Sequence, residues 1–335
     1  MTTRIFLKHR NIWLGIAMLW VVWFHLNWKA PIASLERLKL IGYGGVDICL
    51  FASGAGCYLS LCRDSDPWQF MKRRFSRLLP TYFLFIPFWI LFCFLTGNMT
   101  LRAALGNLLN VQYFTAQGPF FNWYVSAIML LYLLSPMFKS LADQTQGILR
   151  HLVILLLLIA LSIPFWYLQD LLVFATRLPI FYLGILLGKL HQQNAPLRKS
   201  MILVSLAGSC AGLALLFLCS RYLPGYLLPW GLWWYPFLLI TPGMCFAISL
   251  IAEKLTQLSP AKPVLRLLDI IGQHSFEIYL VHLLVKDIYM YLLTNSLISS
   301  DSPFVRTVVI ASIILGTAAL RFGTDALRKA VQSIA

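Results

Sequence analysis

The sequence contains ten apolar runs, each about as long as a helix that crosses a lipid bilayer. A spanning helix takes roughly 20 mostly apolar residues, because each residue adds about 1.5 Å along its axis. The runs occupy residues 11–28, 43–62, 78–97, 122–140, 150–168, 170–190, 200–219, 229–251, 270–293 and 304–322. Backbone groups inside a bilayer must bond to one another, so the runs predict an all-α, polytopic transmembrane helix bundle of about ten spans.

Composition agrees with a membrane protein. Of 335 residues, 59% are hydrophobic and only 12% are charged, whereas soluble domains are about 45–50% apolar and 25% charged. This balance excludes a soluble globular enzyme and a disordered chain. Because no polar linker divides the sequence, we expect a single integral-membrane domain over residues 1–335.

The net charge of +15 is expected to reflect membrane topology. Lysine and arginine concentrate in the loops that stay in the cytoplasm. With the N-terminus inside, most of the 27 basic residues fall on the inner side, so both termini are expected to be cytoplasmic. The positive surface is then expected to meet anionic membrane lipid, and no nucleic-acid partner is predicted.

Two ionisable residues are expected at about the same depth in the outer half of the bundle. His25 lies near the outer end of the first run, and Asp47 lies a few residues into the second. Ionisable groups inside a membrane are costly and commonly functional. An Asp–His pair would fix the imidazole tautomer and raise its basicity. The alternative is a lone buried histidine bonded to a backbone carbonyl.

A basic, amphipathic segment precedes the third run at residues 68–79. It carries Lys72, Arg73, Arg74 and Arg77 on one helical face. One interpretation is a helix that lies on anionic lipid headgroups. The other is a clamp for a phosphorylated ligand, because Arg74 and Arg77 are one turn apart and can present two guanidinium groups to phosphates.

The ninth run carries a polar stripe, which indicates a helix that faces protein or water rather than lipid. The polar side chains that share one narrow arc are Ser275, Tyr279, His282, Lys286 and Tyr289. Glu277 points to the opposite side, where structural packing is an equal alternative. Trp123 opens the fourth run, a position typical of an interfacial aromatic belt. The seven cysteines form no ligand pattern, so no metal is expected.

The order and spacing of five stretches resemble the bacterial membrane acyltransferase 3 family. These stretches are Gly15-Ile16-Ala17 with His25, GGVDICLFASG at 44–54, FMKRRFSRLLPTY at 70–82, WYVSAIMLLYLLSPMF at 123–138 and FEIYLVH at 276–282. The resemblance covers nearly the whole chain. It implies about ten spans in the cell (cytoplasmic) membrane.

The resemblance also implies a reaction. Family members move an acyl group, usually acetyl from acetyl-CoA, to a hydroxyl of an extracytoplasmic glycan or glycolipid. The matching positions imply that His25 is catalytic, and that Arg74 and Arg77, in an Arg-x-x-Arg motif, serve the nucleotide end of coenzyme A. The family's basic residue eleven positions before the histidine is Leu14 here, and an acidic position is Asn11. Arg10, roughly one turn away, is expected to substitute.

These observations predict vectorial O-acyl transfer. We expect acyl-CoA to contact Arg74, Arg77, Arg73, Lys72 and Arg10, and His25 to act either as general base or as transient acyl carrier. Asp47 would orient the imidazole. The supporting polar residues are expected to be Ser53, Trp123, Glu277, Tyr279 and His282, of which Ser53, Tyr279 and His282 are oxyanion candidates.

The principal alternative is a transporter or flippase of a glycan precursor, since intramembrane charges suit that class too. Paired halves with matching broken helices, which typify many transporters, are not visible in the sequence. A non-catalytic membrane scaffold is a third alternative. Consumption of acetyl-CoA separates the first class from the other two. The sequence predicts neither the acceptor nor the oligomeric state.

Overall fold

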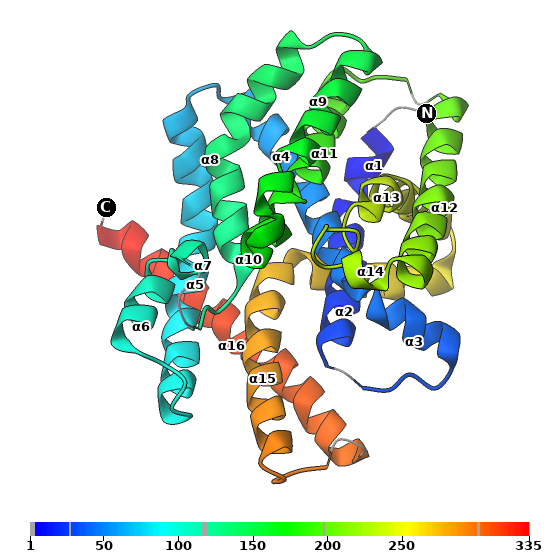
Figure 1. The fold of residues 1–335 in the computed structure, drawn as a ribbon. Helices are drawn as coiled ribbons and strands as arrows, with labels where there is room; N and C mark the ends of the chain where they lie inside the picture. The colour runs from blue at the N-terminus through cyan, green and yellow to red at the C-terminus, as the bar shows by residue number, and fades with distance from the viewer. Residues whose placement is uncertain (1–3, 27, 116–118, 197, 300–301, 335) are drawn as a thin grey trace.

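The helices expected from the ten apolar runs are present in the computed structural model, which describes residues 4–26, 28–115, 119–196, 198–299 and 302–334. They pack into an all-α bundle (Figure 1), and the described residues contain no β-strand. In chain order the α-helices are α1 (Arg4–Lys8), α2 (Arg10–His25), α3 (Ala33–Leu40), α4 (Gly45–Arg63), α5 (Pro67–Leu95), α6 (Leu101–Leu108), α7 (Gln112–Thr115), α8 (Trp123–Gln144), α9 (Ile148–Ala160), α10 (Gln169–Ala175), α11 (Leu178–Gln192), α12 (Lys199–Tyr222), α13 (Pro236–Leu255), α14 (Lys262–Gln273), α15 (Ser275–Thr294) and α16 (Pro303–Ile334).

Two of the predicted spans differ from the others, one in the length of its helix and one in its charged residues. Eight stretches of the described chain are long and apolar enough to cross a membrane, and they match eight of the predicted runs. The remaining runs, 11–28 and 270–293, form α2, which is 16 residues long, and most of α15. Helix α15 carries Glu277, Lys286 and Asp287. Both helices face other helices, so they do not need a surface suited to lipid.

The run 170–190 is divided into α10 and α11. Helix α10 ends at Ala175, and α11 begins at Leu178 with Pro179 in its first turn. Proline suits a helix start because its missing N–H would have no partner there. Arg177 therefore sits at a helix boundary inside the bundle.

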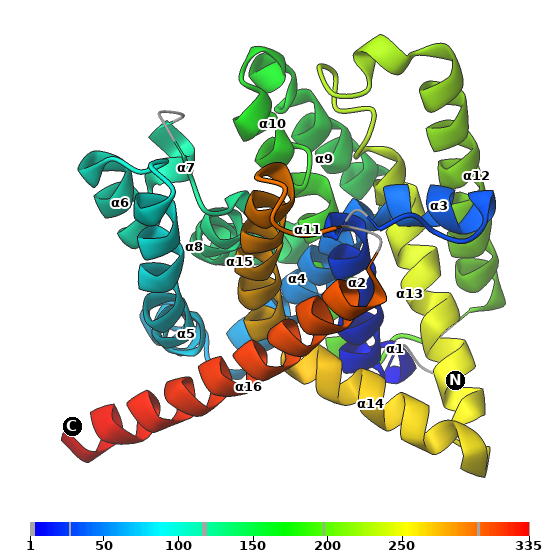
Figure 2. The same cartoon turned by 90° about the horizontal axis from the view of Figure 1, so that it is seen from below.

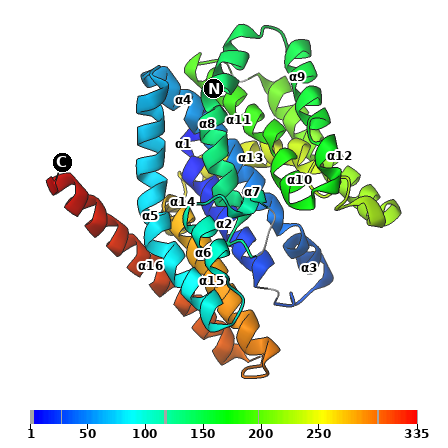
Figure 3. The ribbon, with the colours of Figure 1, turned by 60° about the vertical axis from the view of Figure 1, so that its left-hand side comes forward.

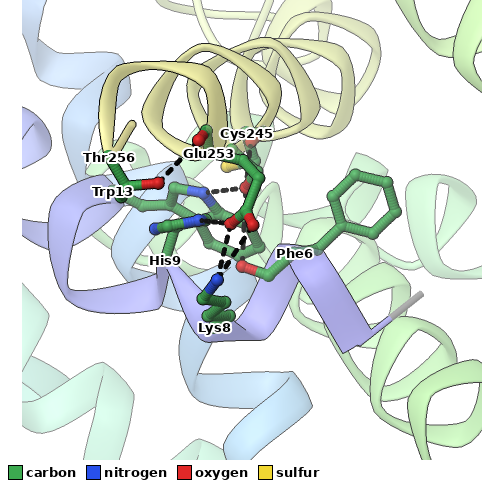
Figure 4. A network of polar contacts seen from close by, with 8 residues as sticks. Phe6, Lys8, His9, Trp13, Cys245, Glu253 and Thr256 are labelled. Atoms are coloured by element: carbon green, nitrogen blue, oxygen red, sulfur yellow. Dashed lines mark hydrogen bonds and ion pairs between the residues drawn. The ribbon is translucent and has the colours of Figure 1, made fainter. Parts of the chain in front are cut away.

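Helix α2 lies in the middle of the bundle. It packs against α4, α13, α14 and α15, and these helices surround it in Figure 2. Its start is held by a polar network with α13 (Figure 4). Lys8 Nζ and His9 Nε2 each lie 2.7 Å from Glu253 Oε2, and the Trp13 indole donates to Ser249 Oγ at 2.8 Å. These contacts tie the start of α2 to α13.

Helices α4 and α11 approach until their backbones touch. A Cβ added to Gly54 would lie 2.3 Å from the Phe181 carbonyl oxygen, and one added to Gly184 would lie 2.2 Å from the Phe51 carbonyl oxygen. Only glycine fits at such distances, and close contact of this kind drives helix association where no hydrophobic effect operates. Gly54 of α4 and Gly184 of α11 therefore serve helix packing.

Helix α16 crosses α5 and α15 at a steep angle and extends beyond the bundle at its C-terminal end (Figures 2 and 3). The crossing joins the end of the chain to the basic start of α5. Arg328 Nη2 donates to the Arg77 carbonyl oxygen at 2.7 Å.

Candidate active site

A cavity of about 1060 Å³ is lined by residues of α2, α4, α5, α8, α14, α15 and α16. We call it the arginine cavity, because the cationic side chains that line it are Arg10, Arg63, Arg73, Arg74, Arg77, Arg321 and Arg328. Glu277 is the one carboxylate among the lining residues. A cavity with this excess of positive charge suits a ligand that carries several negative charges.

Arg10 and Arg74 lie next to each other in the arginine cavity. Arg10 Nε donates to the Ala52 carbonyl oxygen at 3.3 Å, and Arg74 Nη2 donates to the Gly56 carbonyl oxygen. A Cβ on Gly56 would lie within 4.0 Å of both guanidinium groups. Arg10 on α2 thus stands beside the Arg-x-x-Arg helix. Two adjacent cations repel each other, and an anion bound between them would relieve that repulsion.

Aromatic rings hold the Arg74 guanidinium in place. It lies 5.4 Å from the Phe70 ring centroid and 5.5 Å from the Tyr132 ring centroid. Cation–π contacts of this kind orient a guanidinium without using up its N–H donors. Donors of Arg74 therefore remain available to a ligand in the cavity.

The last helix contributes arginines that the sequence analysis missed. Arg321 reaches Asp325 at 2.8 Å and Glu277 at 3.4 Å, and Arg328 lies against α5. Arg63, at the end of α4, also lines the cavity. From the sequence alone, these residues are interpreted as basic residues that determine membrane topology. No local signal shows that α16 returns to cross α5.

Lys72, which the sequence predicts to contact the donor, is not among the residues that line the cavity. The residue is exposed, and the neighbouring Arg73, Arg74 and Arg77 do line the cavity. A helix turns by about 100° per residue, so Lys72 points roughly 160° away from Arg74. The amphipathic face predicted from residues 68–79 was therefore too wide.

The cavity runs along three helices toward His25. On α2 the lining extends from Arg10 through Leu14 and Met18 to Val21, which spans about 16 Å at 1.5 Å per residue. On α4 it extends in the opposite sense from Ser60 through Gly56, Ser53 and Cys49 to Val46, and on α15 from Ser275 to Tyr279. His25 lies one turn beyond Val21, so the lining ends one helical turn from the imidazole.

His25 is paired with a second histidine across the end of the cavity. Its Nδ1 lies 3.1 Å from Nε2 of His282, and His282 Nδ1 lies 3.0 Å from the Ile278 carbonyl oxygen. The His282 side chain is fully buried. The sequence placed both histidines among the candidates, but 257 positions separate them and no local pattern joins them.

The predicted pairing of Asp47 with His25 is wrong. Asp47 Oδ1 faces Arg177, at 3.6 Å from Nε, and both side chains are buried. The reason is rotation about α4: Val46 faces the cavity, and the next residue points about 100° away, toward α11. The expected depth of Asp47 was not enough to select its partner.

Trp123 belongs to the surroundings of Arg177. The Arg177 guanidinium carbon lies 4.9 Å from the Trp123 ring and 4.8 Å from the Trp234 ring. Such an arrangement between two indoles stabilises a cation away from water. The buried Asp47 and Arg177 and the partly buried Trp123 therefore form a cluster that is not part of the cavity lining.

The other predicted polar residues gather at the cavity. Ser53, Glu277 and Tyr279 line it. The Tyr279 hydroxyl donates to Asn122 Oδ1 at 2.8 Å, and its ring lies 5.4 Å from that of His282. Tyr279 therefore separates the end of the cavity from the histidine pair.

A different set of groups lies beyond the histidine pair on α15. Lys286 Nζ contacts Asp287 Oδ1 at 2.8 Å, and the Trp89 indole donates to Asp287 Oδ2 at 2.9 Å. The Trp28 indole donates to the Tyr289 hydroxyl at 3.2 Å. Lys286 lies one helical turn beyond His282 on α15. The Lys286 and Asp287 side chains are each about 30% exposed.

Comparison with known proteins identifies the family. A family model described as an acyltransferase domain, that of acyltransferase 3, matches residues 13–322. No curated protein and no solved structure matches the chain. The matched range includes both members of the histidine pair and every residue that lines the cavity except Arg10, Asn11 and Arg328. The chain belongs to the acyltransferase 3 family of membrane acyltransferases.

Proposed function

We propose that the protein moves an acetyl or other short acyl group from acyl-CoA, bound from the cytoplasmic side, to a hydroxyl of an extracytoplasmic glycan or glycolipid in the cell envelope. The observation that carries the proposal is the arginine cavity, which ends one helical turn from His25. A cationic region that suits a polyanionic donor would thus lie toward one end of the path and the imidazole beyond its other end, behind Tyr279.

The lining of the cavity matches the two ends of an acyl-CoA. Coenzyme A carries a diphosphate and a further phosphate on its nucleotide, and guanidinium groups bind phosphates through paired hydrogen bonds. The pantetheine arm is long and weakly polar. Leu14, Met18, Val21 and Cys49 line the deeper part, so the arm can run along α2 with the thioester directed toward His25.

The chemistry has two routes, and both use the same imidazole. As general base, His25 takes the proton of the acceptor hydroxyl while the oxygen bonds to the acyl carbon; the C–S bond breaks, and the coenzyme A thiolate recovers the proton. As acyl carrier, the imidazole bonds to the acyl carbon first and the thiolate leaves; the hydroxyl oxygen then bonds to the acyl carbon, the acyl–nitrogen bond breaks, and the hydroxyl proton passes to the thiolate. Either route moves the acyl group outward without moving coenzyme A.

The test is acyl-CoA turnover by the purified wild-type protein and by His25→Ala. We expect the variant to bind acetyl-CoA like the wild type but to release no coenzyme A thiol, because the cavity is intact and the reactive group is gone. His151→Ala is the matched control: His151 pairs with Tyr182 at 2.9 Å on α9 and α11, away from the cavity. Full turnover by His25→Ala would refute the role of His25. No acetyl-CoA binding by the wild type would favour a transporter or flippase.

A further inference from the structure

We propose that His282 is a positioning residue that holds a proton on His25 Nδ1, so that His25 Nε2 is the reactive atom. This inference deepens the proposed function by assigning the chemistry to one nitrogen. It rests on the geometry of three polar atoms on α2 and α15.

The first step fixes the tautomer of His282. Its Nδ1 lies 3.0 Å from the Ile278 carbonyl oxygen. A carbonyl oxygen can only accept a hydrogen bond, so Nδ1 carries the proton. Ile278 is one turn before His282 on the same helix, and the contact therefore follows from the local geometry of α15 and does not depend on a distant segment.

The tautomer of His282 in turn determines the tautomer of His25. A neutral imidazole has one N–H, so Nε2 of His282 is left as an acceptor. His25 Nδ1 lies 3.1 Å from it and must supply the proton of that bond. The lone pair of His25 is then on Nε2. An imidazolium at His282 would reverse the bond, but its side chain is fully buried, where an added charge is costly.

The consequence concerns both chemical routes. Nε2 of His25 can take the proton of a hydroxyl or attack the acyl carbon. In each case positive charge develops on the ring of His25 while its Nδ1–H still donates to His282. A buried acceptor at that position orients the ring and stabilises the charge, as the carboxylate does in a serine–histidine–aspartate triad. His282 therefore occupies the place predicted for Asp47, which instead contacts Arg177.

The experiment compares His282→Gln with His282→Leu. The Gln side chain can place an oxygen where Nε2 lies and accept from His25, whereas Leu cannot. We expect Leu to lower kcat about 100-fold with the KM for acetyl-CoA unchanged. This is less than the roughly 10⁴-fold effect of losing the carboxylate of a triad, because a neutral acceptor supplies no charge. Gln should restore kcat to within about tenfold of the wild type.

Two outcomes would overturn the assignment. If both variants fold and bind acetyl-CoA, equal activity of Leu and Gln removes any need for an acceptor. Equal inactivity of the two shows that His282 exchanges protons itself and does more than position His25.

A spectroscopic measurement covers the case in which the Leu variant does not fold. Nitrogen NMR of wild-type protein with labelled histidine, with His25 assigned by comparison with His25→Ala, reports the tautomer directly. We expect a protonated Nδ1 and an unprotonated Nε2 on His25; the reverse pattern contradicts the inference. The NMR measurement does not depend on catalytic turnover. If the wild-type protein consumed no acetyl-CoA, the proposed function would be refuted, but the tautomer of His25 could still be determined.

Discussion

The two approaches to His25 differ in the kind of charge they present. On the side expected to face the cytoplasm, the arginine cavity offers guanidinium groups from α2, α4, α5 and α16 with Glu277 as the one lining carboxylate. On the other side, Lys286 and Asp287 are paired with each other, next to the indole of Trp89. The first surface is strongly cationic, and the second is close to neutral.

Because their charges differ, the two sides suit different substrates. Unbalanced cations favour phosphates and discriminate poorly between neutral molecules. A carboxylate and an ammonium group beside an aromatic ring can bond to hydroxyl groups and pack against the face of a sugar. Under the proposed function, the donor therefore belongs in the cavity and the acceptor on the side of Lys286 and Asp287.

The largest effect is expected for Arg74→Gln on the donor side. The KM for acetyl-CoA should rise about 100-fold with little change in kcat, because charge-assisted hydrogen bonds contribute roughly 1.5–3 kcal/mol and each 1.4 kcal/mol is tenfold in affinity. Initial rates across a range of acetyl-CoA concentrations measure both constants. Arg150→Gln is the control, since Arg150 is exposed on α9 and does not line the cavity. An unchanged KM in Arg74→Gln would show that the Arg-x-x-Arg motif does not bind the donor.

For Arg328→Gln we expect a tenfold change in KM that depends on which acyl donor is used. Arg328 lines the rim of the cavity and is about one-third exposed, and water weakens its contact with a phosphate. We expect the KM for acetyl-CoA to rise about tenfold. Acetyl-dephospho-CoA, which lacks the phosphate on the ribose, should show the same KM with the variant and the wild type. An equal loss with both donors would place Arg328 at the diphosphate instead.

The fold could be predicted from the sequence further than the site. Runs of about 20 apolar residues depend only on bilayer thickness, so the helices were found even for α2 and α15. Arg10, Arg74 and Arg77 were also found, because residues one turn apart on a helix share a face. The tertiary contacts of the site residues could not be predicted in this way. Asp47 and Val46 differ by one position, yet one faces Arg177 and the other the cavity.

Long-range contacts explain the remaining omissions. Arg321 and Arg328 reach the cavity only because α16 crosses α5, and that crossing depends on side-chain packing along two whole helices. The pairing of His25 with His282 likewise requires the relative rotation of α2 and α15. Hydropathy places such residues at a depth in the membrane but leaves the rotation of each helix undetermined.

A change on the acceptor side should leave the donor constants alone. In Asp287→Asn we expect the KM for acetyl-CoA to stay unchanged, while transfer of labelled acetyl groups to the envelope glycan fraction of intact cells falls about fivefold. The size follows from a partly exposed ion pair, which contributes roughly 0–1 kcal/mol, and the amide keeps the shape of the carboxylate beside Trp89. Asp170→Asn, at an exposed residue of α10, is the control. A raised KM for acetyl-CoA would break the division between the two sides.

The smallest effect concerns Asp64, which pairs with Arg73, an arginine of the cavity, and under the proposed function would compete with the donor for it. Asp64 Oδ2 accepts a hydrogen bond from Arg73 Nη1 at 2.6 Å, and this bond lowers the pKa of the carboxyl below its usual value. Removing the carboxylate in Asp64→Asn frees Arg73 for phosphate, so the KM for acetyl-CoA should fall about twofold, as expected for an exposed pair.

The direction of the pKa shift also predicts how this competition depends on pH. A lowered pKa keeps Asp64 ionised as the pH falls through the usual aspartate range near 3.9, and the contact with Arg73 is lost only below it. Between about pH 5 and 8 the carboxylate is therefore charged throughout, and the ratio of the wild-type KM to the variant KM should stay constant. A ratio that drifts toward one within this window would show that Arg73 responds to another group, and that its bond to Asp64 does not limit its contact with the donor.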